Sequence, residues 1–180
     1  NLYCRCFSSV PLTDDNGLHV GGLYGSLNAL QSYVKTFAPS EVYVCWEGAQ
    51  SAERRRKKLK EYKEGRKFVG MRRGFTPSDT DEKEAFTRQL NLLKQCLDSL
   101  PIKEVSVKYL EADDVIAYMA KKVVKDIPKI IISTDKDYFQ LVDESISIFR
   151  PVKTKENPKG EMIDLVWMHK KENIHPYNYA

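Results

Sequence analysis

Cysteine and histidine are scarce in this chain, and their spacing excludes the sites that these residues usually build. The four cysteines, Cys4, Cys6, Cys45 and Cys96, include no Cys-x-x-Cys pair and show no zinc-ligand pairing with the three histidines. A chain of 180 residues, 42% of them hydrophobic, can bury a core without a disulfide framework. We therefore expect no zinc site, and we interpret the cysteines as the reduced thiols of a cytosolic protein.

Long apolar runs are absent as well. No stretch approaches the roughly 20 residues that span a bilayer, so we expect no membrane partner. No signal peptide is visible, although the chain opens at Asn1 rather than at a methionine. There is no internal repeat, and the length fits one domain over residues 1–180, with a monomer as the simplest assembly.

The net charge of +4 hides a strong segregation of charge along the chain. Residues 54–73 contain eleven lysines and arginines and only two acids, which leaves 18 basic and 23 acidic residues elsewhere. One positive segment on an otherwise slightly negative protein indicates a local contact with a polyanion.

Strand-like and helix-like patterns alternate along the sequence and predict an α/β fold. Short apolar or alternating runs predict strands, at 41–46, 105–109, 128–133 and 145–149. Three- and four-residue spacing of apolar residues predicts helices, at 23–37, 76–100, after 111, near 138–142 and at 164–171. The stretch Thr76-Pro77-Ser78-Asp79 is a good start for the second of these helices. The alternation favours a mostly parallel, twisted sheet with helices on both faces.

Acidic residues follow three of the predicted strands. Glu47 follows the first, the segment Glu111-Ala112-Asp113-Asp114 follows the second, and Asp135-Lys136-Asp137 follows the third. In sheets of this kind, ligands bind at the carboxyl ends of the strands. Carboxylates gathered there repel one another unless a cation lies between them or some take up protons. Hard oxygen ligands suit Mg²⁺ or Mn²⁺, and phosphate is the natural further ligand.

Each acidic motif also has a purely structural interpretation. Acids at the start of a helix complement its dipole, and aspartate is common in turns. Because acids follow several successive strands, we favour a metal site over a coincidence of helix-dipole compensation at one motif and turn formation at the other. Phosphodiester cleavage requires an activated water and a neutralised leaving oxygen, and two cations serve both ends of such a displacement.

The basic segment supports nucleic acid as the substrate. It starts soon after the strand that ends at Glu47, so it begins beside the proposed metals. A charged surface helix or a disordered tail is the simpler interpretation of the run taken alone. We expect instead a basic arch over about residues 51–75 that gathers phosphates and threads a single strand, with Tyr62 available for base stacking.

Four stretches together resemble the 5′-nuclease family, which includes phage flap endonucleases and the 5′–3′ exonuclease domain of bacterial DNA polymerase I. The matching stretches are Val20-Gly21-Gly22-Leu23-Tyr24-Gly25-Ser26-Leu27, then Arg55 with Glu61-Tyr62-Lys63 and Arg66, then Glu111-Ala112-Asp113-Asp114-Val115-Ile116-Ala117, and Ser133-Thr134-Asp135-Lys136-Asp137-Tyr138-Phe139-Gln140-Leu141. Their order and spacing agree over nearly all of the chain.

The resemblance implies a PIN-like α/β fold with a basic helical arch, and metal-dependent hydrolysis of 5′ ends or 5′ flaps in DNA, with RNA primers on DNA as a further substrate. It places Glu111, Asp113 and Asp114 around one Mg²⁺, with Asp135 and Asp137 contributing to a second. It makes Lys63 the cation at the scissile phosphate, helped by Arg66 and Arg55. The expected nucleic-acid-binding residues are Arg54, Arg55, Tyr62, Lys63, Arg66 and Lys67. A bacterial protein, or a phage protein in the host cytoplasm, is expected.

Three departures from the family pattern keep other functions open. Family members begin with a strand that supplies a further Asp, and they continue into a helix–three-turn–helix region, so we expect the domain to be truncated at both ends. The position of Glu47 is usually Asp, and the longer side chain shifts its expected metal contact. The alternatives are a non-catalytic domain that binds branched DNA and a PIN-type ribonuclease that cuts single-stranded RNA.

Overall fold

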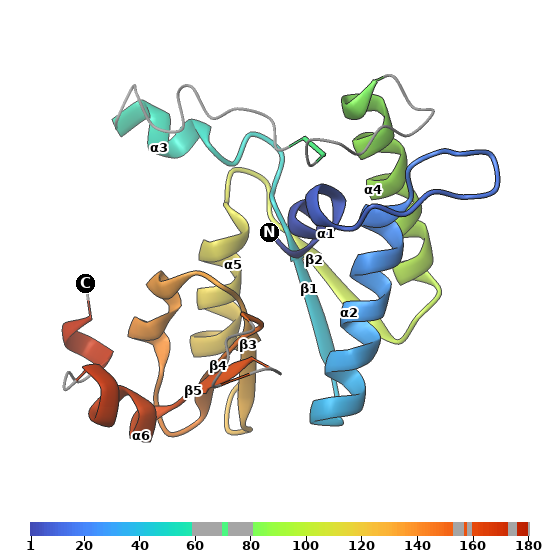
Figure 1. Ribbon diagram of the computed structural model, residues 1–180. Helices are drawn as coiled ribbons and strands as arrows, with labels where there is room; N and C mark the ends of the chain where they lie inside the picture. Colours follow the sequence, from blue (N-terminus) through green and yellow to red (C-terminus); the bar gives the residue numbers. More distant parts are fainter. Residues whose placement is uncertain (59–69, 72–80, 153–156, 158–159, 173–175, 180) are drawn as a thin grey trace. The chain divides into compact units, whose positions relative to one another are not determined.

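The computed structural model describes residues 1–58, 70–71, 81–152, 157, 160–172 and 176–179. The chain forms two compact units (Figure 1), and each is described by itself. Unit 1 comprises residues 1–44 and 55–105, and unit 2 comprises residues 45–54 and 106–180. The boundaries between the units fall within three elements: β1 (Val42–Trp46), α3 (Glu53–Lys58) and β2 (Ile102–Ser106). β1 and β2 pair in a two-stranded sheet.

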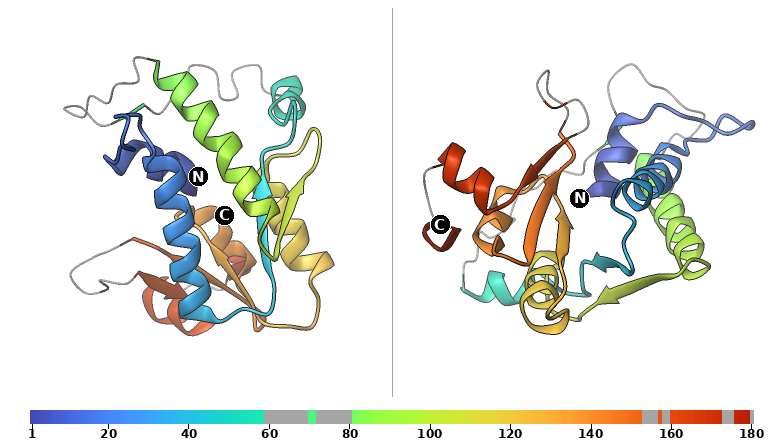
Figure 2. Two further views of the ribbon diagram at one scale, coloured as in Figure 1. Left: turned by 90° about the vertical axis from the view of Figure 1, so that its right-hand side faces the viewer. Right: turned by 90° about the horizontal axis from the view of Figure 1, so that it is seen from below.

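Unit 1 is built around three helices: α1 (Leu2–Ser9), α2 (Gly21–Phe37) and α4 (Glu82–Asp98). α2 packs against both of the others, and Figure 2 shows α2 and α4 side by side. The buried residues of α2 are small, namely Gly21, Gly22 and Ser26. A side chain at Gly22 would run into the ring of Tyr3, so glycine allows α1 and α2 to approach closely.

Unit 2 carries a three-stranded sheet with the order β3 (Lys129–Ile132), β4 (Ile146–Arg150) and β5 (Glu161–Ile163). β3 and β4 are parallel, with Lys129 opposite Ile146, whereas β5 is antiparallel to β4. The other elements of this unit are α5 (Ala112–Tyr118), the π-helical turn η1 (Met119–Val123), the 3₁₀ helix η2 (Lys136–Leu141), α6 (Leu165–Trp167), η3 (Met168–Glu172) and η4 (Pro176–Asn178).

The core of unit 2 is mostly aliphatic. Its fully buried members include Ile146, Ile148 and Ile163 from the sheet, and Met168 from η3. Strand residues that are buried on successive positions of β4 are typical of a strand covered on both sides. The α/β architecture agrees with the sequence-based prediction, and β5 adds an antiparallel edge that the sequence pattern does not predict.

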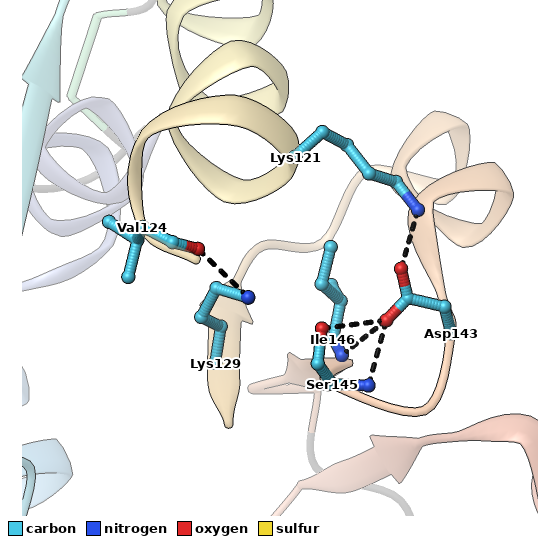
Figure 3. A network of polar contacts seen from close by, with 6 residues as sticks. All are labelled: Lys121, Val124, Lys129, Asp143, Ser145 and Ile146. Atoms are coloured by element: carbon cyan, nitrogen blue, oxygen red, sulfur yellow. Dashed lines mark hydrogen bonds and ion pairs between the residues drawn. The ribbon is translucent and has the colours of Figure 1, made fainter. Parts of the chain in front are cut away.

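The end of the sheet at which β3 and β4 begin is held by a polar network (Figure 3). Lys121 on η1 forms an ion pair of 2.7 Å with Asp143, and Lys129 donates a hydrogen bond of 2.9 Å to the carbonyl of Val124. Asp143 also accepts from the backbone amides of Ser145 and Ile146. The network closes the turn before β4 and ties it to the carboxyl end of the α5–η1 helix.

Two predicted elements begin or end elsewhere in the structure. The strand predicted at 105–109 is β2 at Ile102–Ser106, because the backbone at Tyr109 turns into the left-handed region with φ 67°. α4 begins at Glu82, where the side chain of Asp81 accepts hydrogen bonds from the amides of Lys83 and Glu84. The predicted helix start at Thr76–Asp79 lies outside the described residues, and α1 was not predicted at all.

Within the part of the chain that is described, no helix combines the length and the apolar character needed to cross a membrane.

Candidate active site

The first acidic motif starts helix α5. Glu111 occupies the N-cap position with extended backbone, and its side chain makes no capping hydrogen bond. Its carboxyl group is buried, with only 1% of the residue exposed, whereas Asp113 is exposed and Asp114 is half-buried. Acids in this first turn do face the positive end of the helix dipole. Dipole compensation does not require a buried glutamate, because burying a carboxylate is costly and an exposed one would serve equally well.

The second acidic motif follows strand β3 and starts η2. The side chain of Asp135 accepts a hydrogen bond of 3.0 Å from the amide of Asp137, and the amide of Asp135 donates to the hydroxyl of Ser133 at 3.1 Å. These local bonds fix the turn. These bonds use only one oxygen of the Asp135 carboxylate. Asp137 is exposed to solvent.

Tyr138 connects the two motifs. Its hydroxyl donates a hydrogen bond of 3.0 Å to a carboxylate oxygen of Asp113, although the residue lies next to Asp137 in sequence. Burial raises the pKa of Tyr138 above its usual value, and the negative charges of Asp113 and Asp135 raise it further. The hydrogen bond from Tyr138 to Asp113 is therefore a direct side-chain contact between the segment that follows β3 and the first turn of α5.

The loop that carries Glu47 is joined to the loop that leads into the first motif. The amide of Gly48 donates to the carbonyl of Leu110 at 3.0 Å, and the amide of Tyr109 donates to the carbonyl of Ala49 at 2.9 Å. A side chain on Gly48 would collide with the carbonyl of Val107, so only glycine permits this approach. Glu47 itself is exposed. The sequence pattern did not reveal this pair of bonds.

The carboxylates have the chemistry that a hard divalent cation needs. Among the residues that the structure describes, however, no three side chains of His, Cys, Asp or Glu lie close enough together to hold a metal ion. Mg²⁺ is usually held by one or two carboxylates, with waters and substrate phosphates as the remaining ligands. The predicted ligand set of Glu47, Glu111, Asp113, Asp114, Asp135 and Asp137 therefore stays a prediction.

The predicted basic residues are only partly described. Arg54 and Arg55 belong to α3, and the side chain of Arg55 is half-buried. The remaining predicted phosphate and base contacts, Tyr62, Lys63, Arg66 and Lys67, lie outside the described residues, as does most of the predicted arch.

Comparison with known proteins identifies the family. A family model described as the 5′–3′ exonuclease, N-terminal resolvase-like domain matches residues 1–172. The chain belongs to this family. The resemblance seen in the sequence motifs is therefore confirmed.

Bacterial relatives align with this chain over part of their own length. DNA polymerase I of Thermus thermophilus is 30% identical over 179 residues, which cover 99% of this chain and 19% of the relative. The 5′–3′ exonuclease of Aquifex aeolicus is 29% identical over 163 residues, which cover 90% of this chain and 52% of the relative. The chain thus spans between about a fifth and about half of the length of these relatives.

Solved structures support the fold of this exonuclease domain. A complex of the bacteriophage T5 flap endonuclease with DNA and metal ions aligns with a TM-score of 0.58 and 23% identity, covering 84% of this chain and 53% of the phage protein. The T5 5′-exonuclease with bound zinc aligns with a TM-score of 0.56 and 24% identity, covering 82% and 51%. The PIN-like α/β fold is therefore confirmed.

The sequence-based prediction missed the hydrogen bond between Tyr138 and Asp113. The motif that follows β3 contains this tyrosine, yet only its acids received a role. A signal was present, because an aromatic residue with a polar tip beside two aspartates usually finds a hydrogen-bond partner when its ring is buried.

Proposed function

We propose that this chain is the nuclease domain of a divalent-metal-dependent 5′ nuclease. Its substrate is DNA with a 5′ end or a 5′ flap, and RNA primers paired to DNA are a further substrate. The observation that carries the proposal is the hydrogen bond that joins Tyr138, next to the second acidic motif, to Asp113 of the first, in a chain of the 5′–3′ exonuclease family.

The chain's own residues have three tasks in this function. Asp113 and Asp135 hold the cation, with Glu47, Glu111, Asp114 and Asp137 as further candidate ligands to one or two Mg²⁺ or Mn²⁺ ions. A bound divalent cation neutralises charge on the scissile phosphate and lowers the pKa of a nearby water. Lys63 and Arg66 contact the scissile phosphate, while Arg54, Arg55, Tyr62 and Lys67 bind the flanking strand.

The setting follows from this activity and from the bacterial relatives. We place the protein in the cytoplasm of a bacterium, or of the host of a phage, where DNA with 5′ ends arises. It acts as a monomer, because one set of acids and one basic segment suffice for a cut in one strand.

A double substitution tests the proposal. The full-length protein with Asp113→Asn and Asp135→Asn should lose cleavage of a 5′-flap DNA by about a hundredfold or more, because metal-assisted charge stabilisation contributes several kcal/mol. Binding of the flap, measured by fluorescence anisotropy, should persist. Asp98→Asn, an exposed aspartate at the end of α4, is the matched control and should cleave normally.

The other outcomes separate the rival functions. Unchanged cleavage by the double variant would contradict the proposal. Tight flap binding without any cleavage by the unsubstituted protein would favour the non-catalytic branched-DNA-binding domain, to which the absence of a three-residue metal group among the described side chains also points. Preferential cutting of linear RNA would indicate the single-strand ribonuclease.

A further inference from the structure

The hydrogen bond from Tyr138 joins a residue that is packed in the core, Tyr138 itself, to a residue that is exposed to solvent, Asp113. The ring of Tyr138 is 5% exposed and belongs to the cluster that includes Ile131, Phe139 and Val142. Its position is therefore set by packing. Asp113, in contrast, is an exposed residue in the first turn of a seven-residue helix. An exposed aspartate without a fixed partner samples several rotamers.

The bond also links two segments that are far apart in sequence. Tyr138 is anchored on η2, whose first turn is stabilised by the bond from the Asp137 amide to Asp135. Asp113 lies 25 positions earlier, on α5. The far end of that helix is held separately, since η1 is tied by Lys121 to Asp143 (Figure 3). The Tyr138 hydroxyl thus makes a side-chain contact between the two segments that carry the acidic motifs.

The geometry leaves Asp113 available for a ligand. The hydroxyl occupies one carboxylate oxygen, at 3.0 Å, and a carboxylate offers two oxygens with about four acceptor positions. A neutral donor fixes the orientation of the group without cancelling its charge. Partners of this kind orient metal-binding side chains in many proteins, and their loss typically costs 10- to 100-fold in metal affinity or activity.

We propose that Tyr138 is a positioning residue that holds Asp113 in the orientation needed to bind a divalent cation. Tyr138 acts through Asp113 and does not itself contact the cation or the DNA. The inference deepens the proposed function and rests on it.

The substitution Tyr138→Phe isolates the hydroxyl, because it retains the ring in the core. We expect the affinity of the DNA-free, full-length protein for Mn²⁺, measured by calorimetry, to fall by about tenfold. We expect kcat for a 5′-flap DNA to fall by about 10- to 100-fold, with KM for the DNA changed by less than about twofold. The control Tyr118→Phe removes the same group from a tyrosine of α5 that is 63% exposed, and it should change neither quantity.

A double-mutant cycle shows whether Tyr138 acts through Asp113. If it does, Tyr138→Phe should weaken Mn²⁺ binding no further in a protein that already carries Asp113→Asn. Additive losses would overturn the inference, and so would wild-type Mn²⁺ affinity in Tyr138→Phe or a parent protein that binds no Mn²⁺.

The two measurements also separate this inference from the proposed function. A parent protein that binds Mn²⁺ through Asp113, with an affinity that depends on Tyr138, but never cleaves DNA would refute only the nuclease proposal. A parent that cleaves, with an unaltered Tyr138→Phe variant, would refute only the positioning role.

Discussion

Buried polar side chains in unit 1 satisfy one another, whereas two aspartates of the candidate site in unit 2, Asp113 and Asp137, are exposed. In unit 1, Gln89 accepts hydrogen bonds from the amides of Gly22 and Leu23, at 2.9 and 3.2 Å. His19 lies 3.0 Å from the carbonyl of Val10 through Nε2, so that nitrogen carries the proton, and its Nδ1 accepts from the Gln89 amide at 3.1 Å. Every polar atom of the Gln89 amide is thus used inside the unit.

Three aspartates of the candidate site in unit 2 differ from the residues of this network. Asp113 and Asp137 are exposed, and Asp135 uses one oxygen for its own turn. A carboxylate offers two oxygens, so these side chains keep acceptor positions for a ligand. The comparison indicates that polar groups whose hydrogen bonds are all made within the protein stabilise the fold. Polar groups that keep acceptor positions for other partners are suited to binding a ligand.

The largest expected effect on stability is at Gln89. Gln89→Met keeps the size of the side chain but leaves the Gly22 amide and the Nδ1 atom of His19 buried without these partners. We expect a loss of about 2–4 kcal/mol in the free energy of unfolding, measured by urea titration at an unchanged m value. Gln95→Met, an exposed position on the same helix, is the control. If both variants lost the same small free energy of unfolding, the Gln89 network would not stabilise unit 1 in the way that we infer.

An intermediate effect is expected at Asp143, which is a structural acid in unit 2. Burial by itself raises the pKa of Asp143, but hydrogen bonds from Lys121 and Ser145 outweigh it and lower the pKa to about 2. Because the folded pKa lies below the unfolded value of 3.8, this stabilisation is present above about pH 4 and is lost as the pH falls toward 2.

The substitution Asp143→Asn should therefore cost about 1 kcal/mol at pH 7, allowing for solvent screening of a side chain that is 33% exposed, and progressively less as the pH falls toward 2. Unfolding by urea at a series of pH values measures this difference. The exposed neighbour Glu144 supplies the control Glu144→Gln. A loss that is the same at every pH would show that the ion pair with Lys121 is not its source.

The smallest effect is expected at Asp137, an exposed acid of the candidate site. Without added divalent cation, Asp137→Asn should leave the free energy of unfolding within about 0.5 kcal/mol of the parent value, with any change in the stabilising direction, because it removes one of several neighbouring negative charges. Thermal and urea unfolding both report this value. A clear destabilisation would mean that Asp137 belongs to the fold, as Gln89 does, rather than to the site.

Local sequence patterns were sufficient for the elements near the acids. The apolar runs before Glu47 and Asp135 became β1 and β3, and Glu111 became the N-cap of α5, because short apolar runs and acids at helix starts have local causes. β5 could not be predicted, since three residues beside a glycine-containing loop carry too little pattern, and its pairing with β4 is a tertiary contact.

The sequence by itself determined the family, the strands that precede the acidic motifs and the residue types available to a metal and to phosphate, because these depend on motifs and their spacing. Tertiary structure alone decided that Asp113 accepts a hydrogen bond from Tyr138, that Glu111 is buried, and that Gly48 lies against Val107. These features depend on contacts between segments that are distant in sequence, where the direction of a side chain follows from packing and not from its neighbours in the chain.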